Sequence, residues 1–259
     1  MGEAHPGKSR RERLCNMKRL SLLAQLCFVL ALFNAWSVLA ADTNALIDTW
    51  ETQIIGPGSD HATCFLTFSN DFTWAGYGIA LKSFGPISFS GNWGLNSKGK
   101  TTSRFTEYRQ GTTIPGELTM LAARYYRLHG RGKTLAGIRL KGKALTEPPD
   151  VSGKNWLFEV LTQGKTRFQL YTFTAATNLP GWFELTGTNL GQTNVYTING
   201  ALVVTSNRRA NGYLFSDFGS GGTTSVWSFA GKFSPSLDGA RFHGTKDTGH
   251  PLVIYVSKH

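Results

Sequence analysis

The sequence predicts an all-β protein, an antiparallel barrel or two-sheet sandwich built from repeated β-hairpins. From residue 62 onward, short segments rich in Thr, Val, Ile, Phe, Tyr and Trp follow one another, and clusters of Gly, Asn, Ser and Pro separate them. No segment of about ten residues or more has a convincing helical period. A recurring pattern also places Gly two positions after a pair of alternating apolar residues, which indicates hairpins of similar construction.

Residues 1–40 have the composition of a cleaved signal peptide. Six basic residues precede an apolar run at 20–32, and small or aliphatic residues lead to Ala40. A retained membrane anchor is the alternative, but Asn34 leaves the apolar run short of a comfortable span. We therefore expect an exported protein, located outside the cell, in the periplasm or at the cell surface.

Two further parts follow the leader. Residues 41–61 form a lead-in that could be a short helix or irregular chain, and it ends in a Gly56-Pro57-Gly58 turn cluster. Residues 62–259 are expected to form one repetitive all-β domain. Its predicted strands are 63–68, 72–81, 86–94, 101–109, 117–129, 132–144, 155–162, 166–174, 181–188, 194–205, 211–218, 224–233 and 250–257.

Glycine spacing suggests the size of the repeat. Gly130 and Gly142 recur as Gly187 and Gly200, about 57 residues later, which corresponds to a unit of about four strands. Because glycine normally weakens a strand, its recurrence implies a bend or close packing beneath a large ring.

The most informative stretch is 126–144, a predicted hairpin with one basic face. Leu135-Ala136-Gly137 suits a three-residue loop, which would place Gly130 opposite Gly142 and Arg131 opposite Lys141. Alternation then puts seven basic or histidine side chains on one face, a set we call the cationic ribbon. Its members are Arg127, His129, Arg131, Lys133, Arg139, Lys141 and Lys143.

The cationic ribbon has two interpretations. Like charges facing one another across strands repel, so an anionic ligand could compensate them: an acidic polysaccharide, a lipid phosphate, nucleic acid or an acidic partner. Alternatively, the ribbon is a solvated face that discourages edge-to-edge pairing. The second glycine unit carries Glu184, Thr186, Thr188, Thr197 and Asn199 at the corresponding positions, so the scaffold does not itself require the charge.

Cysteines and motifs point to no catalytic or metal centre. Cys64 is the sole cysteine beyond residue 40, so no internal disulfide is expected there. A partner protein could be disulfide-linked only through Cys64. It lies in an apolar run and is expected to be buried and inert, while His61 and Cys64 are too few ligands for a closed zinc site. No cofactor is implied. The carboxylates are spread over several segments: Glu107, Glu117, Glu159, Glu184 and Asp217.

These observations favour an exported, non-catalytic binding or surface-interaction module, with an anionic polymer or lipid headgroup as the leading partner. Two alternatives stay open. Alternating apolar and polar residues also describe a bacterial outer-membrane barrel with the charged face in its lumen. A secreted hydrolase is the other alternative. Ser/His/Asp triads are recognised from their geometry rather than from a sequence motif, so the lack of a motif does not exclude one.

Overall fold

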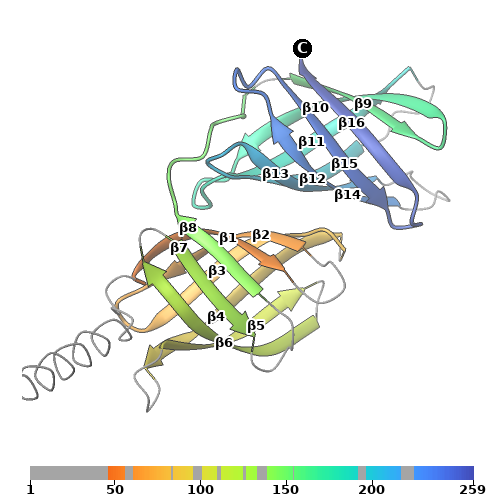
Figure 1. Cartoon of the computed structure of the whole chain (residues 1–259). Helices are drawn as coiled ribbons and strands as arrows, with labels where there is room; N and C mark the ends of the chain where they lie inside the picture. The colour runs from red at the N-terminus through yellow and green to blue at the C-terminus, as the bar shows by residue number, and fades with distance from the viewer. Residues whose placement is uncertain are drawn as a thin grey trace, which may run out of the picture. The chain divides into compact units, whose positions relative to one another are not determined.

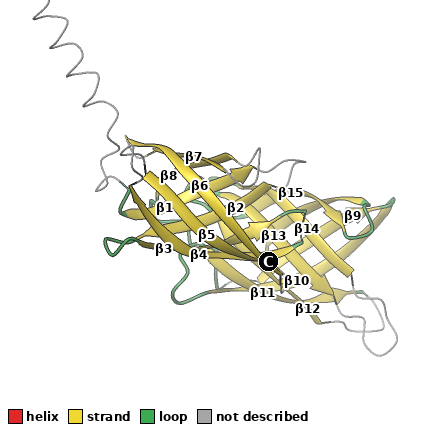
Figure 2. Ribbon diagram, turned by 90° about the horizontal axis from the view of Figure 1, so that it is seen from below, coloured by secondary structure: helices red, strands yellow, loops and turns green. Residues whose placement is uncertain are grey.

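The computed structural model describes residues 46–55, 61–82, 84–95, 101–109, 112–124, 127–132, 139–153, 155–191, 197–216 and 225–259. Every regular element in these ranges is an antiparallel β-strand (Figure 2). The predicted all-β antiparallel class is therefore confirmed, in its barrel form. Within the same ranges no helix is long and apolar enough to cross a membrane. The leader at 1–40 lies outside the described residues, so its cleavage stays a prediction.

Eight strands close a first barrel. Each strand pairs with the next along the chain, and the eighth returns to the first (Figure 1). These strands are β1 (Asp48–Ile55), β2 (His61–Phe68), β3 (Thr73–Ala80), β4 (Gly85–Leu95), β5 (Thr101–Arg109), β6 (Thr112–Arg124), β7 (Arg127–Gly132) and β8 (Arg139–Ala144).

Eight more strands close a second barrel with the same up-and-down order. Closure leaves neither barrel with a free sheet edge. The strands are β9 (Asn155–Thr162), β10 (Lys165–Ala175), β11 (Trp182–Leu190), β12 (Thr197–Val204), β13 (Arg209–Ser216), β14 (Ser225–Phe233), β15 (Gly239–Lys246) and β16 (Pro251–Lys258).

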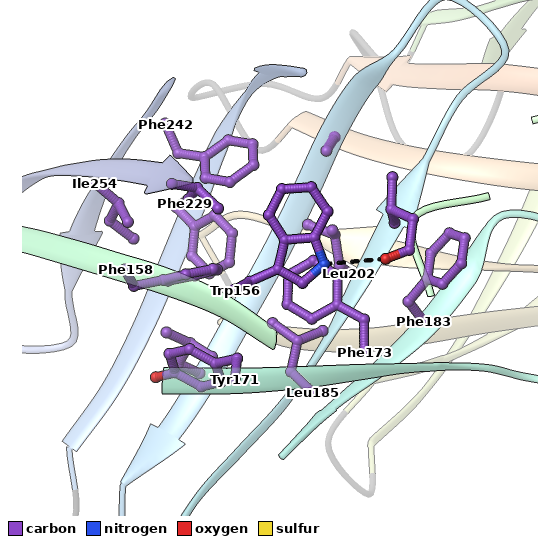
Figure 3. Close-up of a cluster of buried hydrophobic side chains, with 14 of the residues drawn as sticks. Trp156, Phe158, Tyr171, Phe173, Phe183, Leu185, Leu202, Phe229, Phe242 and Ile254 are labelled. Carbon is purple, nitrogen blue, oxygen red and sulfur yellow. Dashed lines mark hydrogen bonds between the residues drawn. The ribbon is translucent and has the colours of Figure 1, made fainter. Parts of the chain in front are cut away.

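Strand alternation fills the second barrel with aromatic side chains. In β9, Trp156, Phe158 and Val160 point inward and are fully buried. Phe173 stacks on Trp156 with ring centroids 5.4 Å apart (Figure 3). Phe229 and the other inward residues complete one continuous apolar cluster. An eight-stranded barrel is just wide enough for side chains to fill, and here the interior is occupied by the protein's own rings.

One tryptophan device recurs at the start of both barrels. The indole nitrogen of Trp50 donates to the carbonyl of Leu46 at 2.9 Å, and that of Trp156 donates to the carbonyl of Val151 at 3.0 Å. Both rings are buried. Each tryptophan thus ties the segment entering a barrel to the barrel core while satisfying its own polar group.

The predicted unit of about four strands corresponds to half of an eight-stranded barrel, and the repeat itself stays a prediction. The two tryptophans belong to the first strand of each eight-stranded barrel, whereas the glycine pairs 130/142 and 187/200 belong to β7–β8 and β11–β12. The two glycine pairs are thus four strands apart. Leu128 faces Gly142 across β7–β8, just as Leu185 faces Gly200 across β11–β12.

Strand limits differ from the sequence prediction in several places, among them the predicted strand 132–144, where residue 132 ends β7 and β8 is Arg139–Ala144. Residues 48–55, expected to be helical or irregular, form β1. The segment 239–246 was missed; Phe242 is its one fully buried large side chain, with Gly239 and Gly244 on either side. The predicted strand 117–129 is divided between β6 and β7. No Gly, Pro, Asn or Asp marks that break in the sequence, so turn chemistry could not reveal it.

A third apolar cluster joins side chains of both barrels. Phe65 and Ile79 from the first barrel pack with Ala201 and Val203, which are exterior residues of β12 yet buried. Nearby, the Tyr77 hydroxyl donates to the carbonyl of Pro180 at 2.9 Å. This explains why β12 is buried on both sides along its second half.

Candidate functional site

The predicted hairpin exists, with a register shifted by two residues. Arg131 pairs with Arg139 rather than Lys141, and His129 pairs with Lys141. Gly130 faces Leu140, so the expectation that Gly130 and Gly142 face each other is wrong. The observed register pairs each glycine with a leucine, whereas the predicted one would pair the two glycines with each other. Because the shift is an even number, it moves no residue to the other face.

Burial shows which face is outward. Leu140 is buried in the core of the first barrel, Lys141 is exposed and Lys143 is half-buried. In the register, Arg127 of β7 pairs with Lys143, and His129 pairs with Lys141. Lys133 lies outside the described residues.

The register adds one basic position that the sequence analysis missed. Arg124, near the end of β6, pairs with Arg127 after a register irregularity between Met120 and Ala122. The spacing Arg124-Tyr-Tyr-Arg127 is the signal that could have found it, because two residues between basic positions suit a tight connection. The cationic positions thus continue over three neighbouring strands.

Lys141 and Lys143 line a cleft of about 320 Å³. Gln53 and Glu51 of β1 lie on the same side of it, since they pair with Lys141 and Lys143. Arg209 of β13 also lines the cleft, together with Thr205 and Asn207 of the turn that precedes it. Three cationic side chains and two amides therefore meet at one hollow, which is an arrangement of hydrogen-bond donors.

Glu51 is the one carboxylate among the described residues of the cleft lining, and it already has hydrogen-bond and ion-pair partners. Its side chain is only 7% exposed. One carboxylate oxygen accepts hydrogen bonds from the Ser206 backbone N–H at 2.8 Å and from the Ser206 hydroxyl at 2.6 Å. The other oxygen lies 3.7 Å from the Lys143 ammonium, which also donates to the Ser206 hydroxyl at 2.6 Å. Among the described residues, Lys141 and Arg209 have no carboxylate partner, and three cations against one anion leave this lining positive.

Arg209 begins a second cationic row that the sequence analysis also missed. Arg209 pairs with Lys232, and Lys232 pairs with Arg241, so three cations occupy one exterior row of β13, β14 and β15. All three are exposed. In each case the cation directly precedes an inward apolar residue. The signal in the sequence is this repeated pair, as in Lys232-Phe233 and Arg241-Phe242. The second glycine unit, whose outward residues are not cationic, covers only β11 and β12.

The other candidate groups do not gather. Cys64 is fully buried, as predicted. His61 is exposed at the start of β2. Among the residues that the structure describes, no group of three or more His, Cys, Asp or Glu side chains is placed to hold a metal ion. Asp217 lies outside the described ranges.

Comparison with known proteins gives the following. The sequence matches no family model and no curated protein. Among solved structures, a "putative outer membrane protein" of Bacteroides fragilis aligns with 85% of this chain and 100% of its own, at 12% identity and a TM-score of 0.28. Burkholderia oklahomensis agglutinin aligns with 83% of this chain and 96% of its own, at 10% identity and a TM-score of 0.20. Similarity at these TM-scores carries no argument about this chain's function.

Proposed function

We propose that the protein is an exported, non-catalytic binding module whose cationic cleft holds an anionic polymer. The observation that carries this proposal is the cleft lining. Lys141 and Arg209 converge there with the amides of Gln53 and Asn207, while the one carboxylate, Glu51, is occupied by Ser206 and Lys143. Ammonium, guanidinium and amide N–H groups bind carboxylate, sulfate and phosphate oxygens.

The spread of the charges favours an extended polymer over a single headgroup. Basic positions continue from the cleft along β8 to Arg139 and across to β7, and along the exterior row to Lys232 and Arg241. Neighbouring strands lie about 4.8 Å apart, so a row of three strands spans about 10 Å, more than a single anionic group occupies. An acidic polysaccharide presents anionic groups at such repeating intervals, and the predicted export would bring the protein to one.

The polarity of the second barrel supports an exterior in contact with water. Its inward residues form one apolar cluster, and its exposed outward residues include Glu184, Thr186, Lys232 and Arg241. An outer-membrane barrel has the opposite polarity, with an apolar band outside. Of the two alternatives from the sequence, the hydrolase has no favouring observation in the cleft, because glycoside hydrolysis uses a pair of carboxylates and the lining contains one.

The test is binding of the full chain to polygalacturonate, measured by calorimetry at about 50 mM salt. We expect Lys141→Glu and Arg209→Glu each to weaken binding roughly tenfold or more, the loss for a charge contact of about 1.4 kcal/mol. Lys165→Glu makes the same charge change on the exposed β9–β10 hairpin outside the cleft lining, and it should change affinity much less.

A second arm uses phosphatidylglycerol vesicles. Binding to the vesicles without binding to polygalacturonate would replace the polysaccharide by a lipid headgroup. Equal loss of affinity in all three variants would show that only net charge matters and would refute the cleft as the site.

A further inference from the structure

A second hollow lies on the exterior of the second barrel, across β11, β12 and β13. It has a volume of about 450 Å³. The register explains its shape. Glu184 pairs with Ala201, and Ala201 pairs with Tyr213, so the middle strand presents a methyl group between two large side chains. Ala201 itself is 2% exposed, because it packs against Phe65 and Ile79, so the accessible part of the groove is the neighbouring row of Thr186, Asn199 and Phe215.

One wall of this groove is aromatic. Tyr213 and Phe215 stand two residues apart on β13, so both project from the outer face and their rings lie side by side rather than opposite each other. Phe215 is 42% exposed, which is unusual for so large an apolar ring. Trp182 lines the groove from β11, and its ring is held edge-on by Tyr77 at a centroid distance of 6.1 Å.

Beyond Trp182, the β11 side and the middle strand of the groove carry polar side chains. Glu184 and Thr186 project from β11, and Asn199 projects from β12, all of them exposed. Thr186, Asn199 and Phe215 form one cross-strand row, so an amide and a hydroxyl adjoin the aromatic ring. Burial, together with the negative charge of Glu184, raises the pKa of the Tyr213 hydroxyl, which therefore stays protonated and can donate at neutral pH.

We propose that this groove binds a neutral oligosaccharide. A sugar ring has an apolar C–H face that packs on aromatic rings and an edge of hydroxyl groups that are both donors and acceptors. The groove offers both kinds of surface: the Tyr213–Phe215 wall for the ring face, and Glu184, Thr186 and Asn199 for the hydroxyl groups. A series of two adjacent rings on one strand suits consecutive sugar units.

Charge separates this groove from the cationic cleft. Among the residues that the structure describes, its lining contains one carboxylate and no Lys, Arg or His, so anionic ligands are disfavoured. Tyr213 and Phe215 follow one another along one strand, and Phe215 adjoins an exposed amide and hydroxyl, which suits a chain of sugar units better than a compact organic cation. The ligand that fits is therefore uncharged and rich in hydroxyl groups. This site does not depend on the proposed polyanion cleft.

The test is binding of the full chain to cellotetraose, chitotetraose and α-mannotriose, each titrated to about 10 mM by calorimetry and by ligand-observed NMR. We expect at least one of them to bind, and we expect the affinity to stay constant between about 50 mM and 500 mM salt because no ligand charge is involved. Phe215→Ala should weaken binding roughly three- to tenfold, and Glu184→Gln by a similar factor.

The matched control is Phe168→Ala, which removes a ring of similar exposure (45%) from the exterior of β10 in the same barrel and should leave affinity unchanged. Three outcomes would overturn the proposal: no binding of any of the three oligosaccharides, equal effects of Phe215→Ala and Phe168→Ala, or binding of tetramethylammonium in place of the sugars. A steep salt dependence would also overturn it, because it would assign the ligand to the cationic cleft.

Discussion

Replacing Trp156 by phenylalanine should destabilise the second barrel by about 2–4 kcal/mol. The indole is fully buried and donates to the Val151 carbonyl at 3.0 Å, within the cluster shown in Figure 3. Phenylalanine cannot donate, so the buried carbonyl loses its partner, at a cost of about 1–3 kcal/mol. The smaller ring also leaves unfilled volume beside Phe173, which adds about 1 kcal/mol.

Trp227→Phe provides the control. Trp227 is buried to a similar degree, but its indole donates to the hydroxyl of Ser225 at 2.9 Å in a part-buried position. That hydroxyl can rotate toward water, so the same substitution should cost only about 1 kcal/mol. Urea unfolding followed by far-ultraviolet circular dichroism measures both. If Trp156→Phe costs no more than Trp227→Phe, the argument from the buried carbonyl is refuted.

Three further predictions concern the junction, the packing and the pH dependence. Glu51→Gln should lower the free energy of unfolding by about 1–3 kcal/mol, because a neutral amide replaces the carboxylate that binds Ser206 and Lys143. The same change removes a negative charge from the cleft lining, so it should strengthen polygalacturonate binding. Weaker binding would contradict this. Gly187→Ala should cost about 1–3 kcal/mol, because an added Cβ would overlap the Tyr171 ring and the Leu170 carbonyl, whereas Gly94→Ala, with open space at that point, should be nearly neutral in the same unfolding assay. Burial raises the folded-state pKa of Tyr77, Tyr171 and Tyr213 above 10.0. Their contribution to folding stability is therefore fully present below about pH 10 and is lost as the pH rises further. A thermal midpoint that stays constant up to about pH 11 would contradict this.

The sequence was sufficient for the class of fold and for one face of the site. Alternation in segments such as 155–162 predicted strands with the observed limits, because an inward aromatic or aliphatic residue at every second position leaves little other choice. The same parity placed Lys141 and Lys143 outward, and a register error of two residues could not change it.

The register of the strands and the closure of the barrels could not be predicted, because they depend on contacts between strands. The β7–β8 register pairs Leu128 with Gly142 and Leu140 with Gly130. The sequence also suited a three-residue loop at 135–137, which led to the wrong register. The number of barrels depended on which strand returns to β1, a pairing between residues about ninety positions apart.

The cleft could not be predicted for a related reason. Arg209 and Asn207 reach Lys141 only because Glu51 binds Ser206 and because exterior residues of β12 are buried against Phe65 and Ile79. No local pattern encodes that junction. The Tyr213–Phe215 groove was likewise hidden, since its shape comes from the small Ala201 on a neighbouring strand.

The central claim is that the cationic side chains of the cleft contact the charges of an anionic polymer. Its most direct test is the salt dependence of polygalacturonate binding, plotted as the logarithm of the association constant against the logarithm of salt concentration. Each ion pair that forms contributes a slope of roughly −0.7 to −0.9 on a densely charged polymer. We predict that Lys141→Ala and Arg209→Ala each reduce the steepness by about that amount, while Lys165→Ala leaves it unchanged. A slope that stays the same in both cleft variants would contradict the account.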